Sequence, residues 1–278
     1  MTRFAFCTCF PGMLLQLAIH AVQVTFIIYD TSQNIYYFRE NYSMENTITI
    51  LYDNKTALPG LASGWGFSCV IDYNGKRILF DTADNPDKLL SNLNSLHIPV
   101  SSIEYLVISH DHWDHTGGVE AILSLNPGIT VYYPATFPDD FRTSLQQRDI
   151  KHVPVTELTE IIPGVSAGPL MFSNDPDEIP ISISTVNGIS IITGCAHPGI
   201  LDIIERISSM FDKKIDLVAG GFHLSFYGGA EHILESFMKL KVQRAAPCHC
   251  TGDEAIELFA DRFDPGFIRI GAGTIIEL

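Results

Sequence analysis

Hydrophobic residues follow two alternating patterns from Thr47 onward. Short runs rich in β-branched and aromatic residues predict strands, and apolar residues three or four positions apart predict helices. The predicted strands cover 47–53, 65–73, 76–81, 103–110, 128–134, 189–194, 214–221, 242–250 and 272–278. The predicted helices cover 86–96, 119–125, 200–211, 229–241 and 253–263. Between 135 and 187 the pattern loosens, and we expect irregular loops that are functional or mobile there.

The strands come in two batches, each followed by helices. This order predicts an α/β (α+β) fold in which two sheets pack face to face with helices outside. We therefore expect a four-layer αββα sandwich, built as one catalytic domain over residues 44–278. Asn74-Gly75 predicts a two-residue turn between the second and third strands.

Residues 1–43 form a separate N-terminal extension with an apolar segment at 12–29. Polar residues interrupt this segment, and the sequence after it lacks a clear cleavage site for a signal peptide. Three interpretations remain open: a signal or anchor, a start assigned too early with Met44 as the working start, or a folded extension. A start at Met44 predicts a cytoplasmic protein, whereas a genuine extension predicts a membrane-anchored or exported one.

Composition narrows the range of partners. The chain has 278 residues, of which 46% are hydrophobic and 18% charged, as is typical of globular proteins. A net charge of −15 disfavours nucleic-acid binding, which needs a basic surface. We expect a small-molecule substrate, no nucleic acid, and no membrane unless the apolar segment is retained. The six cysteines are unevenly spaced, which indicates buried thiols rather than a disulfide framework.

The stretch VISHDHWDHTGG, residues 107–118, crowds metal-binding side chains behind a buried strand. In extended backbone, residues two apart face the same side, so His110 and His112 can bind one metal ion. Asp114 and His115 open the helix that follows and can serve a second position. Two-metal hydrolytic sites hold their ions about 3.5–4 Å apart. Imidazole with carboxylate suits zinc, and also iron or manganese.

These motifs resemble the metallo-β-lactamase fold superfamily. The resemblance covers 47–278, and its segments are GWGFSCVIDYNGKRILFDT, SHDHWDHTGGV, ITGCAHPGI, GGFHL and PCHCTG. These segments occur in the order found in one branch of the superfamily. That branch is similar to a methanopterin-pathway enzyme, a dihydropterin ribofuranosylaminobenzene phosphate synthase. One departure is Ala83, where relatives carry glycine after the Asp-Thr of FDT.

The resemblance implies that two divalent metal ions are bound. Zinc is the expected metal, and iron or manganese are the alternatives. His110 and His112 bind the first ion and Asp114 and His115 the second. Four further positions complete the implied site. They are His197 for the first ion, His249 as the last histidine ligand, Asp81 as the residue that orients ligand imidazoles, and Cys195 as a possible thiolate.

Alternatives stay open at several of these positions. Asp81 is otherwise a turn-forming residue, and Cys195 a small buried one. His223 is interpreted as a substrate-facing or proton-donating residue, or as a structural one. Cys248 and Cys250 are expected on the opposite face of their strand from His249 and are not predicted as ligands. The remaining histidines are expected on the surface or in packing: His20, His97, His152 and His232.

The implied activity is that of a dinuclear metal enzyme acting on a small, phosphorylated or pterin-like substrate. Bound metal lowers the pKa of water to about 7, so hydroxide forms at neutral pH. Asp114 would hold the nucleophile's proton and His223 would protonate the leaving group. A general hydrolase of lactones, esters or phosphodiesters fits the same residues. An RNA-processing nuclease and a di-iron oxygen-reducing protein fit less well, since neither a basic surface nor a flavin domain is indicated.

Overall fold

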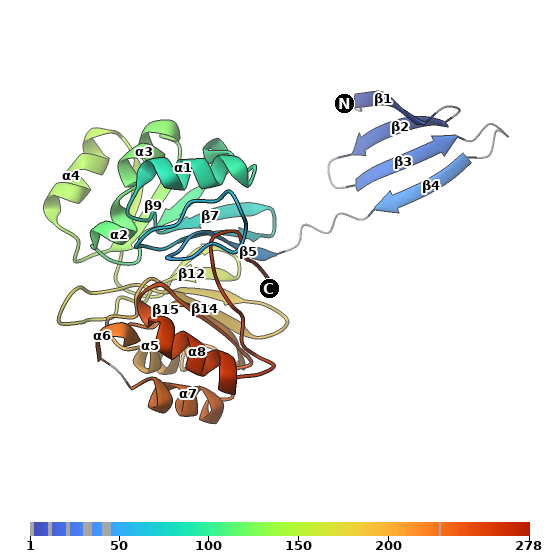
Figure 1. The fold of residues 1–278 in the computed structure, drawn as a ribbon. Helices are drawn as coiled ribbons and strands as arrows, with labels where there is room; N and C mark the ends of the chain where they lie inside the picture. Colours follow the sequence, from blue (N-terminus) through green and yellow to red (C-terminus); the bar gives the residue numbers. More distant parts are fainter. Residues whose placement is uncertain (1–2, 11–12, 21–22, 30–34, 41–45, 228) are drawn as a thin grey trace. The chain divides into compact units, whose positions relative to one another are not determined.

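The computed structural model describes residues 3–10, 13–20, 23–29, 35–40, 46–227 and 229–278. It divides into two compact units, residues 1–45 and 46–278 (Figure 1). Each unit has its own sheet structure and is described by itself.

Four antiparallel strands form the first unit in the order β1-β2-β3-β4. Their bounds are β1 (Arg3–Phe10), β2 (Met13–His20), β3 (Gln23–Tyr29) and β4 (Ile35–Glu40). The apolar segment at 12–29 contributes β2 and β3, while positions 12, 21 and 22 lie outside the described residues. Among the residues the structure describes, no helix has the length and apolar character needed to cross a membrane.

The second unit is the predicted sandwich: two sheets pack face to face, with helices on both outer faces (Figure 1). One sheet has the order β10-β9-β8-β7-β6-β5-β17 and the other β11-β12-β13-β14-β15-β16. The first sheet consists of β5 (Thr47–Tyr52), β6 (Ser68–Tyr73), β7 (Lys76–Phe80), β8 (Tyr105–Val107), β9 (Thr130–Pro134), β10 (Lys151–Val155) and β17 (Ile275–Glu277). The second consists of β11 (Thr159–Ile162), β12 (Val165–Ala167), β13 (Ile181–Ser184), β14 (Ile189–Thr193), β15 (Ile215–Gly221) and β16 (Arg244–Cys248).

Helices cover the outer face of each sheet. The first sheet carries α1 (Pro86–Ser95), α2 (Trp113–Thr116), α3 (Val119–Leu125) and α4 (Asp139–Gln147). The second carries α5 (Ile200–Ser208), α6 (Leu224–Tyr227), α7 (Ala230–Lys239) and α8 (Asp253–Arg262). Two 3₁₀ turns add η1 (Val100–Ser102) and η2 (His249–Thr251).

Alternation along the strands explains why both faces of each sheet are buried. In β5, Ile48 and Ile50 join the cluster between the sheets, whereas Leu51 joins the cluster beneath the helices. In β15, Leu217 faces the inner cluster and Val218 the helix side. Each such fully buried aliphatic side chain stabilises the fold by about 1.5–3 kcal/mol. The sandwich therefore depends on three apolar layers, one inside and two outside.

The hairpin at Asn74-Gly75 is confirmed. Tyr73 pairs with Lys76 across the turn, and both turn residues have positive φ, 49° and 78°. This is the geometry that a two-residue hairpin requires.

The region 135–187 is more regular than the sequence predicts. It contains α4, β10, β11, β12 and β13, and an irregular loop remains at 168–180. The strands here are three to five residues long and interrupted by proline and glycine, so their hydrophobic pattern is too short to detect.

Candidate metal centre

Parallel strands of both sheets end at one rim, and their carboxyl ends position the chemistry. β7 and β8 are parallel in the first sheet, as are β14, β15 and β16 in the second. The residues that follow these five strands include Asp81, His110, His197, His223 and His249. The sheet topology therefore brings together side chains that lie far apart along the chain.

A first group of possible metal ligands consists of three imidazoles. Donor atoms of His110, His112 and His197 all lie within 4.8 Å of one another. Their ring centroids are 4.7–4.9 Å apart. Nε2 of His110 and Nε2 of His197 are buried and have no hydrogen-bond partner among the described residues. Buried polar atoms without a partner are costly, and a shared cation would satisfy them.

A second group combines a carboxylate with two imidazoles. Asp114 Oδ2 lies 3.4 Å from His249 Nε2 and 3.9 Å from His115 Nε2. The two Nε2 atoms are 3.2 Å apart, and all three side chains are buried. An oxygen and two nitrogens at this spacing form a suitable donor set for a divalent ion.

Two polar partners fix the orientation of these imidazoles. His115 Nδ1 donates to Asp81 Oδ2 at 2.6 Å, so Nε2 presents its lone pair to the site. His249 Nδ1 lies 3.1 Å from Asn54 Oδ1. The same oxygen accepts the Gly66 N–H, and the Asn54 amide nitrogen donates to His249 O. His249 Nδ1 is therefore the donor, and two lone pairs face each other, which a cation would stabilise.

Asp81 also holds the strand end that carries His110. Its carboxylate accepts the Ser109 N–H and the Ser109 hydroxyl, both at 2.7 Å. The Ser109 hydroxyl oxygen in turn lies 2.7 Å from His110 Nδ1. The structure thus places Asp81 in contact with His115 directly and with His110 through Ser109.

The electrostatics of His197, His110 and Asp114 favour the protonation states that metal ligands need, whereas at His115 burial lowers the pKa but the Asp81 carboxylate raises it more. Burial, together with His223 and His112, lowers the pKa of His197 to about 3, and burial lowers that of His110 strongly. Burial alone would raise the pKa of Asp114, but the neighbouring His249 and His115 imidazoles lower it to about 2. Neutral imidazoles and an ionised carboxylate are the forms that bind metal.

Glu178 is a buried residue of the site that the sequence analysis missed. Its Oε1 accepts the N–H groups of Gly194 and Cys195 at 2.9 and 3.1 Å, and its Oε2 accepts the His197 N–H at 2.9 Å. The carboxylate thus fixes the turn that carries His197. No motif marks it, because it lies in the loop before β13, although that loop belongs to the region predicted to be functional.

The glycines of TGG allow α2 to pack against the FDT turn. A Cβ at Gly117 would lie 2.4 Å from Asp84 O, and the Gly117 N–H donates to Ala83 O at 2.9 Å. Ala83 itself has φ 57°, a left-handed conformation that favours glycine. Ala83, which stands where relatives carry glycine, therefore occupies a backbone position at which glycine would relieve strain.

Cys250 lies in the site, contrary to the sequence-based expectation. β16 ends at Cys248, and residues 249–251 form η2, so strand alternation does not apply to them. The Cys250 Sγ, the Cys195 Sγ and a His249 ring nitrogen all lie within 4.8 Å of one another. Cys195 Sγ also lies 3.3 Å from His115 Nε2. Cys248 is in none of the donor groups found among the described residues.

His223 lies beside the first group. Its ring centroid is 4.4 Å from that of His197, and it has φ 55°. A hydrogen bond with Cys250 raises the pKa of His223. Of the other histidines, His97 and His232 are exposed, His152 contacts the Tyr133 hydroxyl at 3.1 Å, and the side chain of His20 lies outside the described residues.

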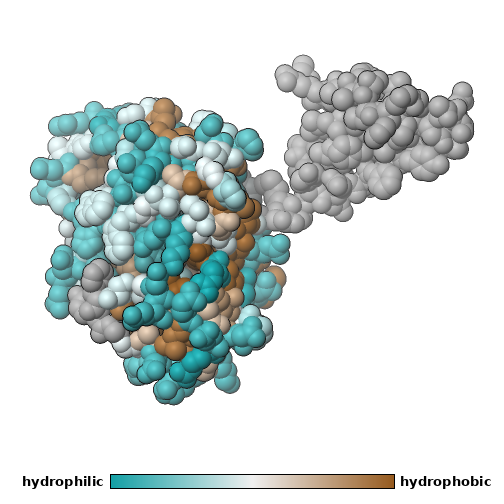
Figure 2. All heavy atoms as spheres, in the orientation of Figure 1, coloured by the Kyte–Doolittle hydropathy of each residue, from teal (hydrophilic) through white to brown (hydrophobic). Residues whose placement is uncertain are grey.

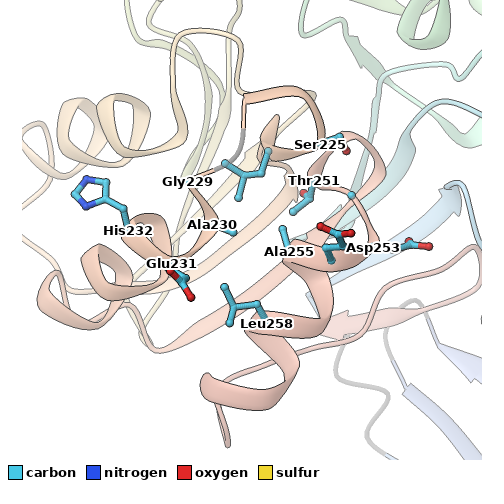
Figure 3. Close-up of a pocket in the computed structure, with 12 residues that line it drawn as sticks. Ser225, Gly229, Ala230, Glu231, His232, Thr251, Asp253, Ala255 and Leu258 are labelled. Atoms are coloured by element: carbon cyan, nitrogen blue, oxygen red, sulfur yellow. The ribbon is translucent and has the colours of Figure 1, made fainter.

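An open pocket adjoins the rim on the side of α7 and α8. Its volume is about 910 Å³, and its lining includes Leu224. Thr251 and Asp253 also line it and are labelled in Figure 3. Leu224 and Thr251 directly follow His223 and Cys250 in the chain. This pocket is large enough for a small organic molecule.

The visible face of residues 46–278 mixes hydrophilic and apolar patches (Figure 2).

The sandwich and its rim of histidines, carboxylate and thiols define the class of protein: an αββα fold with a candidate metal centre at the strand ends. The chain belongs to the metallo-beta-lactamase superfamily, whose family model matches residues 66–249. Members of this fold usually depend on metal, and the two donor groups fit divalent ions.

Relatives and solved structures agree with this family. The chain is 29% identical over 262 residues to 7,8-dihydropterin-6-methyl-4-(beta-D-ribofuranosyl)-aminobenzene-5'-phosphate synthase of Methanocaldococcus jannaschii, covering 77% of this chain and 89% of that protein. The crystal structure of Tm1679, a metal-dependent hydrolase of the beta-lactamase superfamily, matches with TM-score 0.70 and 28% identity over 84% of this chain and 99% of its own. A diphosphatase of the PhnP family, at 14% identity and TM-score 0.55, shares the fold over 84% of this chain and 97% of its own.

Proposed function

We propose that the protein is an enzyme that holds two divalent metal ions and acts on a small phosphorylated or pterin-like substrate. One observation carries this proposal: six donor side chains, four after β8, one after β14 and one after β16, supply two groups whose donor atoms lie within 4.8 Å of one another. His110, His112 and His197 would hold one ion, and Asp114, His115 and His249 the other. When bound, the ions would supply an activated water and polarise a phosphoryl or carbonyl oxygen.

The chain's own residues would position and protonate the reactants. Asp114 is ionised and lies in the second donor group with His115 and His249, so it can hold a proton of the attacking group. His223 lies beside His197 at the rim and would donate a proton to the leaving group. The pocket next to η2 would bind the body of the substrate.

The relative at 29% identity makes a synthase reaction the first candidate. That enzyme's name describes the joining of a dihydropterin to an aminobenzene riboside phosphate. A hydrolase is the second candidate. The crystal structure of Tm1679, which is 28% identical to this chain, is that of a metal-dependent hydrolase. The donor groups serve either reaction, since both need a neutralised phosphoryl or carbonyl oxygen.

Metal analysis followed by paired assays tests the proposal. Protein purified without added metal is expected to retain about two divalent ions per chain, as in two-metal enzymes. The holoenzyme is then assayed with a pterin methyl diphosphate plus the aminobenzene riboside phosphate, and separately with phosphodiester and lactone substrates. Turnover of the first pair supports the synthase, and turnover of the others the hydrolase. Retention of no metal would overturn the proposal.

A further inference from the structure

Three aromatic side chains near the metal donors are exposed instead of packing in the core. Trp65 is 42% exposed, Trp113 63% and Phe172 76%. Phe67, two positions after Trp65, is fully buried, so an aromatic side chain in the same stretch can reach the core. Exposed apolar side chains that cluster on a protein surface mark binding sites. Together, Trp65, Trp113 and Phe172 are referred to as the aromatic surface.

The two tryptophans flank the second donor group. The Trp65 ring lies against the His249 imidazole, with ring centroids 5.2 Å apart and planes inclined at 58°. Trp113 opens α2 directly before Asp114. A Cβ at Gly66 would lie 2.5 Å from Asp114 O. The segment that carries Trp65 therefore lies directly against the turn that carries Trp113.

Phe172 belongs to the loop at 168–180, which lies against the first donor group. The Ser173 hydroxyl donates to His197 O at 3.2 Å. Asp175 Oδ1 lies 4.0 Å from His112 Nε2. Phe172 is thus one residue away from a contact with a proposed metal ligand. The three members of the aromatic surface come from three segments of the chain, and each segment contacts a donor group.

Flat aromatic side chains favour a flat aromatic ligand. Indole and phenyl faces attract other planar rings in offset or edge-to-face contacts, and a heterocyclic base stacks on them through its own π-face. An aliphatic ligand would be bound equally well by leucine or isoleucine. Metal ions at the donor groups would bind a phosphoryl or carbonyl oxygen, so a ring attached to that group would come to lie beside the metal ions. The exposed aromatic residues lie beside the same donor groups.

We propose that the aromatic surface stacks on the planar heteroaromatic ring of the substrate, with Trp65 and Trp113 as its main members. This inference rests on the proposed function, because it names the part of the substrate that the same site recognises. The pocket next to η2 would then take the remaining part of the molecule. Stacking of this kind selects pterin-like compounds over aliphatic esters and simple phosphates.

Tryptophan fluorescence of the holoenzyme provides the test. The chain contains two tryptophans, and both belong to the aromatic surface, so this signal reports on the proposed contact alone. The protein is titrated with 6-methylpterin, which carries the ring without a phosphate, and free N-acetyltryptophanamide corrects for light absorbed by the pterin. Saturable quenching is expected, and calorimetry gives the dissociation constant.

Paired variants separate stacking from general apolar contact. Trp65→Leu and Trp113→Leu keep an apolar side chain, and each is expected to weaken 6-methylpterin binding at least about 5-fold, the effect of losing one stacked aromatic side chain. Trp65→Phe and Trp113→Phe should restore most of the affinity. Leu125→Ala is the matched control: Leu125 is 57% exposed at the end of α3 away from the histidine turn, and its variant should bind like the wild type.

Inorganic phosphate and metal content show whether the site itself stays intact. Phosphate has no ring to stack, so its affinity for the metal-loaded protein should be the same in the wild type and in all variants. Metal content should also be unchanged. A leucine variant that loses phosphate binding together with pterin binding would contradict selective stacking, because the whole site would then be disturbed.

The outcomes distinguish this inference from the proposed function. Absence of quenching in the wild type, or leucine variants that bind 6-methylpterin as tightly as the wild type, would overturn the stacking surface, while retained metal would leave the metal enzyme in place. Pterin binding that depends on both tryptophans in a protein without metal would support the stacking surface and overturn the proposed function.

Discussion

The two proposed metal positions differ in how the protein holds them. His112 of the first position is 34% exposed at its side chain, and Asp175 Oδ1 lies 4.0 Å from its Nε2. In the second position His115 and His249 have fully buried side chains, each with a hydrogen bond that fixes its tautomer. The comparison indicates an open first position suited to meeting substrate and a closed second position suited to retaining its ion.

Removal of the exposed ligand is expected to have the largest effect. His112→Ala takes one of three imidazoles from the first position, so one metal equivalent should be lost. Turnover should fall by at least about 10³-fold, because a metal supplies more stabilisation than a single hydrogen-bond donor. Elemental analysis and steady-state kinetics measure the two effects. His97→Asn, at an exposed histidine with φ 57°, is the control, and equal metal content in both variants would refute the assignment of His112.

Asp81→Asn tests the closed position. The neutral amide of asparagine can still accept the His115 Nδ1–H, but it lacks the negative charge of the carboxylate. We therefore expect metal affinity to fall about 10- to 100-fold, the usual effect of losing such a partner. Competition with a chelator measures the affinity. Asp72→Asn, which breaks the Asp72–Arg77 ion pair at 2.8 Å far from the rim, should leave it unchanged. An Asp81 variant that binds metal as tightly as wild type would contradict the role of this carboxylate.

Glu178→Gln tests the support beneath the first position. Glutamine keeps one acceptor oxygen for Gly194 and Cys195 but turns an N–H toward the His197 N–H. Leaving that donor without a partner should lower the free energy of unfolding by about 1 kcal/mol, the lower end of the range for a lost buried hydrogen bond. Denaturant unfolding of the apoprotein measures it, with Glu160→Gln in β11 as the control. Stability equal to that of the control would show that the carboxylate does not hold the turn.

Ala83→Gly should have the smallest effect. Relief of the left-handed conformation gains about 1 kcal/mol, and loss of a buried methyl group costs about 0.8 kcal/mol. The free energy of unfolding should therefore change by less than about 0.5 kcal/mol, within the usual range for mild substitutions. Thermal unfolding of the two proteins provides the measurement. A larger loss of stability would mean that the methyl group, which is fully buried, packs more tightly than its surroundings indicate.

Local patterns sufficed for the fold and for part of the site. Alternating apolar residues predicted the sandwich, and the Asn74-Gly75 turn was predicted from two residues. The spacing of His110, His112, Asp114 and His115 placed four candidate ligands on one turn. The structure puts His110 with His112 in one donor group and Asp114 with His115 in another, while His110 and His115 also share a group with Cys195. The boundaries in 135–187 were not predicted, because its strands are shorter than a detectable period.

Partners distant in sequence were not predictable in this way. Asn54 and His249 are 195 positions apart, and nothing in either local sequence indicates their contact. Glu178 binds the His197 turn from a loop without a motif. Cys250 was excluded on the assumption that a strand continues through it, whereas the chain turns at His249, which has φ 50°.

By itself, the sequence determined the strand and helix pattern, the family and the crowded turn of metal-binding side chains, because each depends on residues within a few positions of one another. Only the tertiary structure decided which strand ends meet, which carboxylate and amide orient each imidazole, and which thiols face the donor groups. The physical reason is that parallel strands place their carboxyl ends at a common edge, and the resulting distances depend on packing between both sheets rather than on spacing along the chain.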